Sequence, residues 1–202
     1  MKKLIFTLVA IFWLNTSAYC QTALSQTDLE AFKDRIGMMI DTFQSYLSIL
    51  GSKEKSPNVK KSYKQQTLEL FIGDGEPYKD IETGELQPAV SMEVSALRNG
   101  IESKRKLPMK KYLDNLIALP YVKVEITSAG TYHLSNLHPV GDHYEATAFI
   151  FQKFCGYGAD GRKKYCDTTK KVIKIYLIPE EDIRGVHWTV KFGDISVGET
   201  SN

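Results

Sequence analysis

The chain has 202 residues, of which 43% are apolar and 25% charged, with 14 Gly and 7 Pro. This composition excludes a disordered chain, a collagen-like chain and a low-complexity linker, and the length predicts a single domain. The 26 basic and 24 acidic residues nearly balance, so the chain lacks the field that gathers a phosphate backbone, and nucleic acid is not expected as a partner.

The first twenty residues have the three parts of a secretory signal peptide. Lys2 and Lys3 form a positive start, an apolar run follows from Leu4 to Leu14, and residues 15–20 end in small side chains. The apolar run has eleven residues, whereas a membrane-spanning helix needs about 20. The sequence therefore predicts export through a cleaved signal over residues 1–20, with no membrane association afterwards.

Cleavage is expected after Cys20, and cleavage after Ala18 is the alternative. Attachment of a lipid at Cys20 needs a small residue immediately before the cysteine, and the bulky Tyr19 argues against it. Removal of the signal takes away two lysines and leaves 24 basic and 24 acidic residues. The mature chain, residues 21–202, is expected to be one domain in the periplasm or outside the cell.

A long amphipathic helix is predicted over about residues 28–50. Thr27 and Glu30 are spaced as a capping box at its start, and Gly51 is interpreted as a left-handed stop. Its apolar side chains recur at helical spacing and form one continuous stripe: Leu29, Phe32, Ile36, Met39, Ile40, Phe43, Leu47 and Leu50. A stripe of this length must pack against something large.

Two shorter helices are predicted further along the chain. Ser56 and Pro57 open the first of them as cap and first helical residue, and Gly73 closes it. The second follows Pro108 and ends before Pro120. The basic cluster Lys104-Arg105-Lys106, with Lys110 and Lys111 nearby, is interpreted as the solvated entrance of this helix rather than as a contact for an anionic surface.

Alternation of apolar and polar residues predicts strands at 90–96, 122–126, 144–155, 165–178 and 187–192. Most of these strands come late and most of the helices come early. The sequence therefore predicts an α+β fold, with three N-terminal helices packed on a curved antiparallel sheet of about five strands.

The order of elements and the segments YLDNLIALPYVKVEI and HWTVKFGDISVGET resemble exported bacterial proteins of the nuclear transport factor 2-like superfamily. This cone-shaped fold is shared with ketosteroid isomerases and scytalone dehydratase, and the resemblance covers about residues 27–198, the expected ordered core. It implies a pocket in which catalytic members place an Asp or Glu base and a Tyr or His donor. The candidates to face such a pocket are Tyr63, Tyr112, Tyr144, Tyr176, Glu93 and Glu145. No motif assigns a catalytic role to any of them.

Cys155 and Cys166 flank a hairpin signal, the dipeptide Asp160-Gly161. If these two residues form the turn, the numbers of paired residues sum to 321, and the two cysteines lie opposite each other. Opposed residues have Cα atoms about 4.5–5.5 Å apart, within the range of a disulfide. We therefore predict a Cys155–Cys166 disulfide formed after export, which would contribute on the order of 2–3 kcal/mol. Two free thiols are the alternative.

Three histidines, His133, His138 and His143, are spaced five apart in a stretch rich in turn residues. They are interpreted as surface histidines, because a spacing of five matches neither a helix face nor a strand face. A zinc or copper site is the alternative if the loop folds back. A second alternative is a general base formed by His143 and Asp142.

An acidic loop precedes the first strand and is interpreted as solvated, because the regular spacing of calcium ligands is missing: Asp74, Glu76, Asp80, Glu82 and Glu85. Nucleophile elbows, phosphate-binding Gly loops and paired zinc cysteines are absent from the sequence. No metal and no cofactor is therefore expected.

The segment Gln152–Gly156 is also similar to the Gln-x-Val-x-Gly hairpin of cystatin protease inhibitors, and His187-Trp188 to their second hairpin. Phe154 and His187 depart from the cystatin pattern, and cystatins have one helix before their long strands.

The favoured function is an exported, non-enzymatic domain that binds a small apolar ligand or a protein partner. One alternative is a pocket enzyme of the isomerase or dehydratase type, which requires a cavity holding a buried carboxyl of raised pKa beside a Tyr or His. Another alternative is a module that forms a homodimer through its sheet.

Overall fold

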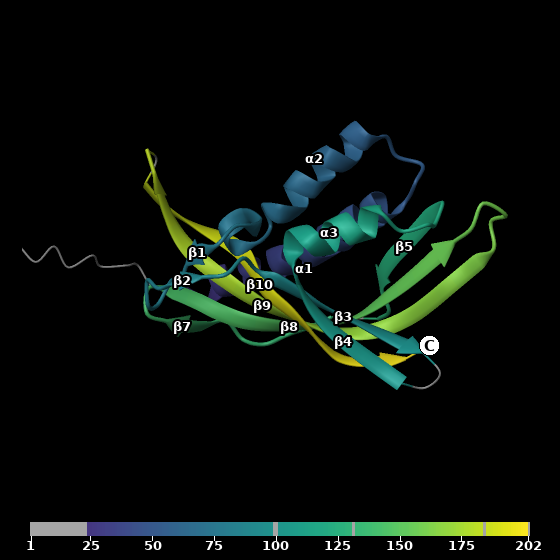
Figure 1. Ribbon diagram of the computed structural model, residues 1–202. Helices are drawn as coiled ribbons and strands as arrows, with labels where there is room; N and C mark the ends of the chain where they lie inside the picture. The colour runs from purple at the N-terminus through teal and green to yellow at the C-terminus, as the bar shows by residue number, and fades with distance from the viewer. Residues whose placement is uncertain (1–23, 99–100, 131, 184, 202) are drawn as a thin grey trace, which may run out of the picture.

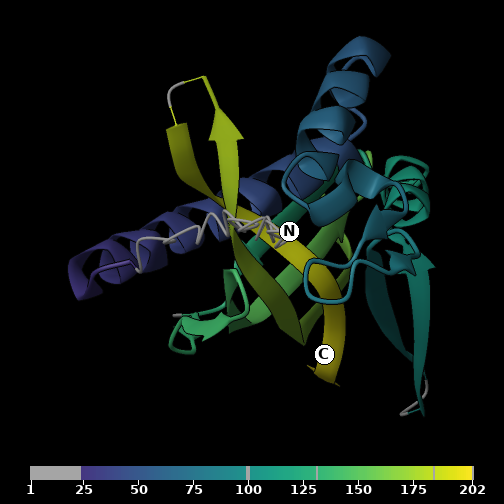
Figure 2. The ribbon, with the colours of Figure 1, turned by 90° about the vertical axis from the view of Figure 1, so that its left-hand side faces the viewer.

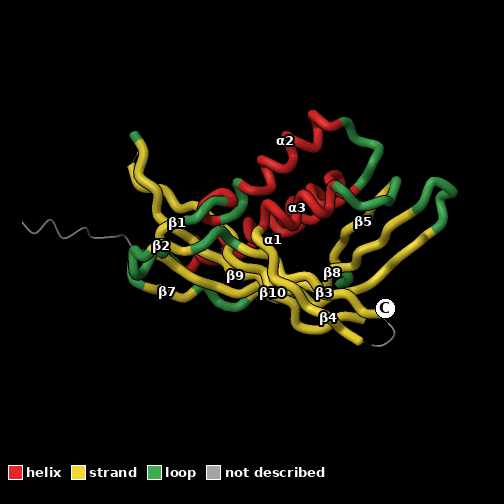
Figure 3. Tube along the Cα trace, in the orientation of Figure 1, coloured by secondary structure: helices red, strands yellow, loops and turns green. Residues whose placement is uncertain are grey.

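In the computed structural model of the chain, the three helices of the described residues cover one face of a curved sheet (Figures 1 and 3). The long first helix crosses the sheet (Figure 2). The structure describes residues 24–98, 101–130, 132–183 and 185–201. The expected signal peptide lies outside these residues. Within them, no helix combines the length and the apolar character needed to cross a membrane.

The helices of the described residues are α1 (Gln26–Gly51), α2 (Pro57–Leu68) and α3 (Met109–Ile117), with a short 3₁₀ turn, η1 (Ile72–Gly75), after α2. Ser56 caps α2 and Pro57 is its first residue, as predicted. The predicted end of this helix at Gly73 was wrong: α2 ends earlier, and Gly73 has a φ of 71° within η1.

The start of α1 has a capping box, although not the one predicted. The Ser25 hydroxyl accepts the backbone N–H of Asp28, and the Asp28 carboxylate accepts the backbone N–H of Ser25. Thr27 and Glu30, the predicted pair, lie inside the helix instead. Ser25 and Asp28 have the same spacing and chemistry as the predicted pair, so the pattern alone did not choose between them.

Gly51 is the last residue of α1, and the prediction that it would be a left-handed stop was wrong. A Cβ atom on Gly51 would lie 2.9 Å from Cβ of Val124, which is closer than packed carbon atoms allow. Glycine at this position therefore permits the end of the helix to lie directly on a strand of the sheet.

Within the part of the chain that the structure describes, eight strands form the main sheet. Six of them follow one another in the order β4 (Ile101–Pro108), β3 (Ser91–Arg98), β10 (Gly185–Ser201), β9 (Lys163–Asp182), β8 (His143–Tyr157) and β5 (Lys123–Ser128). Two short strands, β6 (His133–Leu134) and β7 (His138–Val140), also pair with β8. A separate small sheet joins β1 (Tyr78–Lys79) to β2 (Leu86–Gln87).

The α+β class is confirmed, but the predicted arrangement was wrong in two respects. The third helix lies between β4 and β5 rather than among the N-terminal elements. The sheet has more than the five strands expected. It is also mixed rather than antiparallel, because β3 pairs with β10 in the parallel direction at Met92 and Ile195.

The basic cluster explains part of this difference. Lys104, Arg105 and Lys106 lie on β4, at the edge of the sheet, rather than at a helix entrance. Charged residues are typical of edge strands, because they discourage pairing with another chain. The Lys104 ammonium donates to the carbonyl of Gly198 at 2.6 Å, and that of Lys106 lies 2.7 Å from the Asp194 carboxylate. A strand so rich in charge shows little apolar alternation.

The core lies between the helices and the inner face of the sheet. Phe43 of α1, Phe71 before η1 and Phe192 of β10 pack edge to face, with ring centroids 5.4 to 6.1 Å apart. Such pairs add about 0.5–1.5 kcal/mol each beyond their buried area. The α1 side chains buried in this core are those of the predicted stripe: Ile36, Ile40, Phe43, Leu47 and Leu50.

The predicted disulfide is confirmed: Cys155 and Cys166 are bonded and face each other across β8 and β9, with Cα atoms 4.2 Å apart. The predicted turn was wrong by one residue. The N–H of Gly161 donates to the carbonyl of Gly158 at 3.0 Å, so Ala159 and Asp160 form the centre of the turn.

A second irregularity restores the predicted register. Tyr157 pairs with Lys163, whereas Gly156 pairs with Tyr165, so that Lys164 is an extra residue on β9. A shift of the turn by one residue changes the sum of paired residue numbers by two, and Lys164 restores one of these. Gly161 restores the other as a further extra residue, because the N–H of Gly158 donates to the carbonyl of Arg162 at 3.0 Å. The cysteines are therefore opposed because the shifted turn and the two extra residues cancel.

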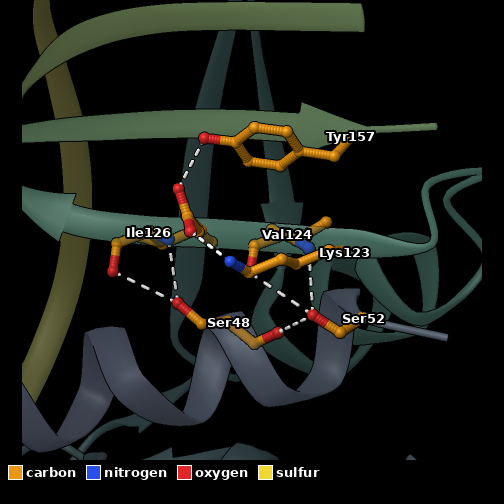
Figure 4. A network of polar contacts seen from close by, with 7 residues as sticks. Ser48, Ser52, Lys123, Val124, Ile126 and Tyr157 are labelled. Carbon is orange, nitrogen blue, oxygen red and sulfur yellow. Dashed lines mark hydrogen bonds and ion pairs between the residues drawn. The ribbon is translucent and has the colours of Figure 1, made fainter. Parts of the chain in front are cut away.

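The edge strand β5 is closed by the hydroxyl groups of Ser48 in α1 and of Ser52, the residue that follows α1 (Figure 4). The backbone N–H of Val124 donates to the Ser52 hydroxyl at 2.9 Å, and that of Ile126 donates to the Ser48 hydroxyl at 2.8 Å. An unpaired strand edge would otherwise expose these groups to another chain. The helix thus replaces the next strand of the sheet.

The rise per residue of the helix and of the strand lets the same contact recur along the two elements. Four residues of a helix rise about 6 Å, and two residues of a strand rise about 6.6 Å. Side chains four apart on α1 therefore reach alternate residues of β5. The contact continues one step further, because Gln44 donates to the Ser128 hydroxyl at 2.8 Å. We call these contacts of Gln44, Ser48 and Ser52 with β5 the serine ladder.

Replacement of Ser48 by alanine leaves the N–H of Ile126 without its partner in a partly buried setting. We expect the free energy of unfolding, measured with urea, to fall by about 1–3 kcal/mol. Ser45→Ala is the matched control, because the Ser45 hydroxyl donates to the carbonyl of Asp41 in its own helix. The control is expected to change stability by no more than about 0.5 kcal/mol. Equal losses in both variants would contradict the ladder.

Candidate functional site

A cavity of about 240 Å³ lies between α3 and strands β3, β4, β8 and β9. Its lining comes from elements far apart in the sequence: Val94, Ser95, Arg105, Leu107, Tyr112, Asn115, Leu116, Leu119, Gln152, Phe154, Tyr165, Asp167, Thr169 and Lys171. We call this space the α3 cavity. It is smaller than the roughly 300–1,000 Å³ typical of sites for drug-sized ligands.

The walls of the α3 cavity are mainly apolar. Leu116 and Leu119 come from the end of α3 and the residues after it, and Val94, Leu107 and Phe154 come from the sheet. Leu116 also belongs to the main hydrophobic core. The cavity is therefore continuous with the core at one side.

The floor of the α3 cavity is polar and comes mostly from β9. Asp167, Thr169 and Lys171 alternate along this strand and share one face of it, with Gln152 of β8 beside them. All four are buried, with 6% to 8% of each residue exposed. Further along the same face, β9 carries fully buried apolar residues: Ile173, Ile175 and Leu177. One strand face thus changes from core to polar floor.

Lys171 is a buried lysine without a carboxylate partner among the described residues. Its ammonium group donates to the backbone carbonyl of Glu93 at 2.8 Å. No described carboxylate oxygen lies within 4 Å of it. Burial lowers the pKa of Lys171 to about 8, even though the charges of Asp167 and Glu93 act in the opposite direction. A buried charge of this kind is expensive to keep.

Asp167 lies in the same floor with two tyrosines near it. The Tyr165 hydroxyl donates to its carboxylate at 2.6 Å. Burial raises the pKa of Asp167, although the hydrogen bond from Tyr165 and the charge of Lys171 act to lower it. Burial also raises the pKa of Tyr112, and the charge of Asp167 adds to this effect. Asp167 and Lys171 are four residues apart on one strand, or about 13 Å.

Of the residues expected to face a pocket, Tyr112 lines the α3 cavity. Glu93 adjoins it through its carbonyl, while its carboxylate accepts the N–H of Val197 at 2.7 Å. The other candidates do not line it: Tyr63, Tyr144, Tyr176 and Glu145. Tyr176 and Glu145 both contact Lys174.

Sequence reasoning missed Asp167, Lys171 and Gln152. The available signal was the polar residues at alternate positions of an apolar-rich strand predicted at 165–178. The segment similar to the cystatin hairpin lies inside β8, and its Gln152 and Phe154 line the α3 cavity.

The three histidines do not converge. The described residues contain no group of three metal-binding side chains. His133 on β6 and His138 on β7 are exposed strand residues. The expectation of a surface histidine was wrong for His143, which is buried at the start of β8. Its ring nitrogens lie 3.3 Å from the Glu145 carboxylate and 3.5 Å from that of Asp142.

The acidic loop uses its carboxylates to hold its own shape. Asp80 accepts the backbone N–H groups of Glu82 and Thr83 at 3.1 and 2.8 Å. Asp74 lies 3.2 Å from Lys191, and Glu76 pairs with Lys110. These contacts tie the loop to β10 and α3.

Comparison of the chain with protein-family models, with curated proteins and with solved structures found no match. The structure itself defines the class of protein. It is an α+β domain with a mixed curved sheet and a partly polar cavity beneath its third helix.

The lowered pKa of Lys171 predicts a pH dependence of stability. The unfolded chain keeps this proton up to a pKa near 10.5, and the folded chain loses it near 8. The unfolded state therefore binds more protons in this window, and the free energy of unfolding rises with pH across it. Lys171→Met removes the effect. We expect the stability of this variant relative to the wild type to fall by on the order of 2–3 kcal/mol between pH 7 and pH 10.

Urea unfolding at the two pH values measures this difference. Lys170→Met is the control, because Lys170 points to the other face of β9, where its ammonium lies 5.5 Å from the Phe149 ring centre. If the free energy of unfolding changed between pH 7 and pH 10 by the same amount in Lys171→Met as in the wild type, the ammonium would not be desolvated in the folded protein.

Proposed function

We propose that the chain is an exported protein that binds a small, mainly apolar molecule bearing a polar group in the α3 cavity. The observation that carries this proposal is the pairing of apolar walls with a buried polar floor that includes Lys171. Ligand sites have this composition, with few polar groups in a mostly apolar concavity. Folding alone favours apolar residues at buried positions, so a retained buried charge supports a functional role.

The concave shape of the site favours a small molecule over a protein partner. The disulfide supports export, because such bonds persist in oxidising compartments. The helices held against one face of a curved sheet, with a cavity between them, support membership of the nuclear transport factor 2-like superfamily.

Filling the α3 cavity is expected to abolish binding. Val94→Phe places a ring in the cavity, and Val59→Phe on the exposed side of α2 is the matched control. Hexanol, hexanoate and indole serve as probes in ligand-observed NMR titrations of the purified protein. At least one probe is expected to bind saturably, with affinity reduced at least about tenfold by Val94→Phe and unchanged by the control. Equal binding to both variants would place the probe elsewhere and contradict the proposal.

A second candidate function is a pocket enzyme of the isomerase or dehydratase type. One observation favours it: Asp167 is buried in the cavity with a raised pKa and accepts a hydrogen bond from Tyr165. A carboxylate in an apolar setting can act as a general base, and a neighbouring tyrosine can donate to a developing oxyanion.

Isomerisation of 3-cyclohexenone to the conjugated 2-cyclohexenone, followed by ultraviolet absorbance, tests this second candidate. An enzyme would accelerate the reaction, and Asp167→Asn would reduce the rate at least about 100-fold. Asp160→Asn, in the exposed turn where Asp160 pairs with Lys164, should leave the rate unchanged. If the wild-type protein does not accelerate the reaction, the proposal of an isomerase-type enzyme is rejected.

A further inference from the structure

The geometry points to covalent chemistry in the α3 cavity: we propose that Lys171 forms an imine with a small aldehyde or ketone that enters it. This inference rests on the proposed binding function and adds the chemical class of the ligand.

The contacts of Lys171 differ from those of the lysines that form ion pairs with carboxylates. Eight described lysines lie within 4 Å of a carboxylate oxygen: Lys33, Lys64, Lys106, Lys110, Lys123, Lys164, Lys174 and Lys191. Lys171 is more buried than any of these eight lysines, with 6% of the residue exposed. Its described hydrogen bond goes to a neutral carbonyl. A carbonyl stabilises an ammonium less than a carboxylate does.

Burial in this setting favours the neutral amine, which is the nucleophilic form. The pKa of Lys171 is lowered to about 8 by burial. About a tenth of the residue is then neutral at pH 7, whereas the neutral fraction of an ordinary exposed lysine is below about a thousandth. Lys171 therefore combines a reactive protonation state with a place in a cavity.

The walls of the cavity suit the rest of such a ligand. Leu116, Leu119 and Phe154 offer contacts to a short hydrocarbon chain or ring. The low exposure of Lys171 limits the access of water to its nitrogen and so favours the product, because water hydrolyses an imine.

The reaction balances without an oxidant or reductant. The nitrogen lone pair forms a C–N bond to the carbonyl carbon, and one N–H proton passes to the oxygen to give a carbinolamine. The C–O bond then breaks, and the departing hydroxyl takes the second N–H proton and leaves as water. One aldehyde or ketone is consumed and one water is released.

Lys60 provides an internal comparison. It too is buried, and its pKa is lowered, first by burial and then by the charge of Lys53. It lines a surface groove shared with other lysines of the α1–α2 connection and α2 rather than the α3 cavity. If a lowered pKa alone decided reactivity, both lysines would react with a carbonyl compound. If reactivity also requires a place in the α3 cavity, Lys171 reacts and Lys60 does not.

Reductive trapping tests this selectivity in the purified wild-type protein. Hexanal is added with sodium cyanoborohydride, which converts an imine into a stable secondary amine, and the modified lysines are identified by peptide mass spectrometry. We expect Lys171 to be modified at least about tenfold faster than Lys60 or any exposed lysine at pH 7, with a rate that reaches half its maximum near pH 8. Uniform modification of the lysines, or equal modification of Lys60, would overturn the proposal.

Two variants sharpen the result. Lys171→Arg keeps a cation but removes the amine, and should abolish the adduct at this position. Val94→Phe should reduce modification of Lys171 without changing that of Lys60. The wild-type measurement stands even if either variant folds poorly.

A parallel titration separates this inference from the proposed function. Hexanol has the same chain as hexanal and cannot form an imine. If hexanol binds in the cavity and hexanal leaves Lys171 unmodified, the imine is refuted and the binding function stands. If hexanol also fails to bind and Lys171 is unmodified, both are refuted for this class of ligand.

Discussion

The match between the helix repeat and the strand repeat is the constraint on which the architecture depends. Four residues of α1 advance about as far as two residues of β5, so Ser48 and Ser52 reach Ile126 and Val124 in turn. The C-terminal part of the long helix is thereby fixed along the edge strand β5, while the helix also packs on the face of the sheet. Gly51 brings the two backbones close enough for these contacts. The position of α1 in turn determines which part of the inner face the other helices must cover.

The α3 cavity follows from this arrangement. Helix α1 and the aromatic cluster fill the inner face where β9 carries Ile173, Ile175 and Leu177. Beyond that point α3 and the sheet enclose the α3 cavity, and the same face of β9 becomes polar from Lys171 to Asp167. One face of β9 therefore contributes to the hydrophobic core at one end and to the floor of the α3 cavity at the other.

Much of this fold could be predicted from the sequence, because its strongest signals are local. The stripe of α1, the cap at Ser56 and the pairing of Cys155 with Cys166 each depend on residues close together in the chain. The parallel pairing of β3 with β10 joins residues about a hundred positions apart, and no local pattern encodes it. Strand β4 was missed because its charged edge sequence has little apolar alternation.

The candidate site was less predictable, because it consists of residues that contradict their local pattern. An apolar-rich strand predicts apolar residues on its buried face, and Lys171 and Asp167 stand at such positions. If folding stability alone had selected these side chains, aliphatic residues of similar volume would serve as well or better. Burial of a lysine that donates to a carbonyl, and of a carboxylate that accepts from a tyrosine, costs free energy that aliphatic side chains would not cost. This cost is the physical reason for proposing that the function lies in the α3 cavity.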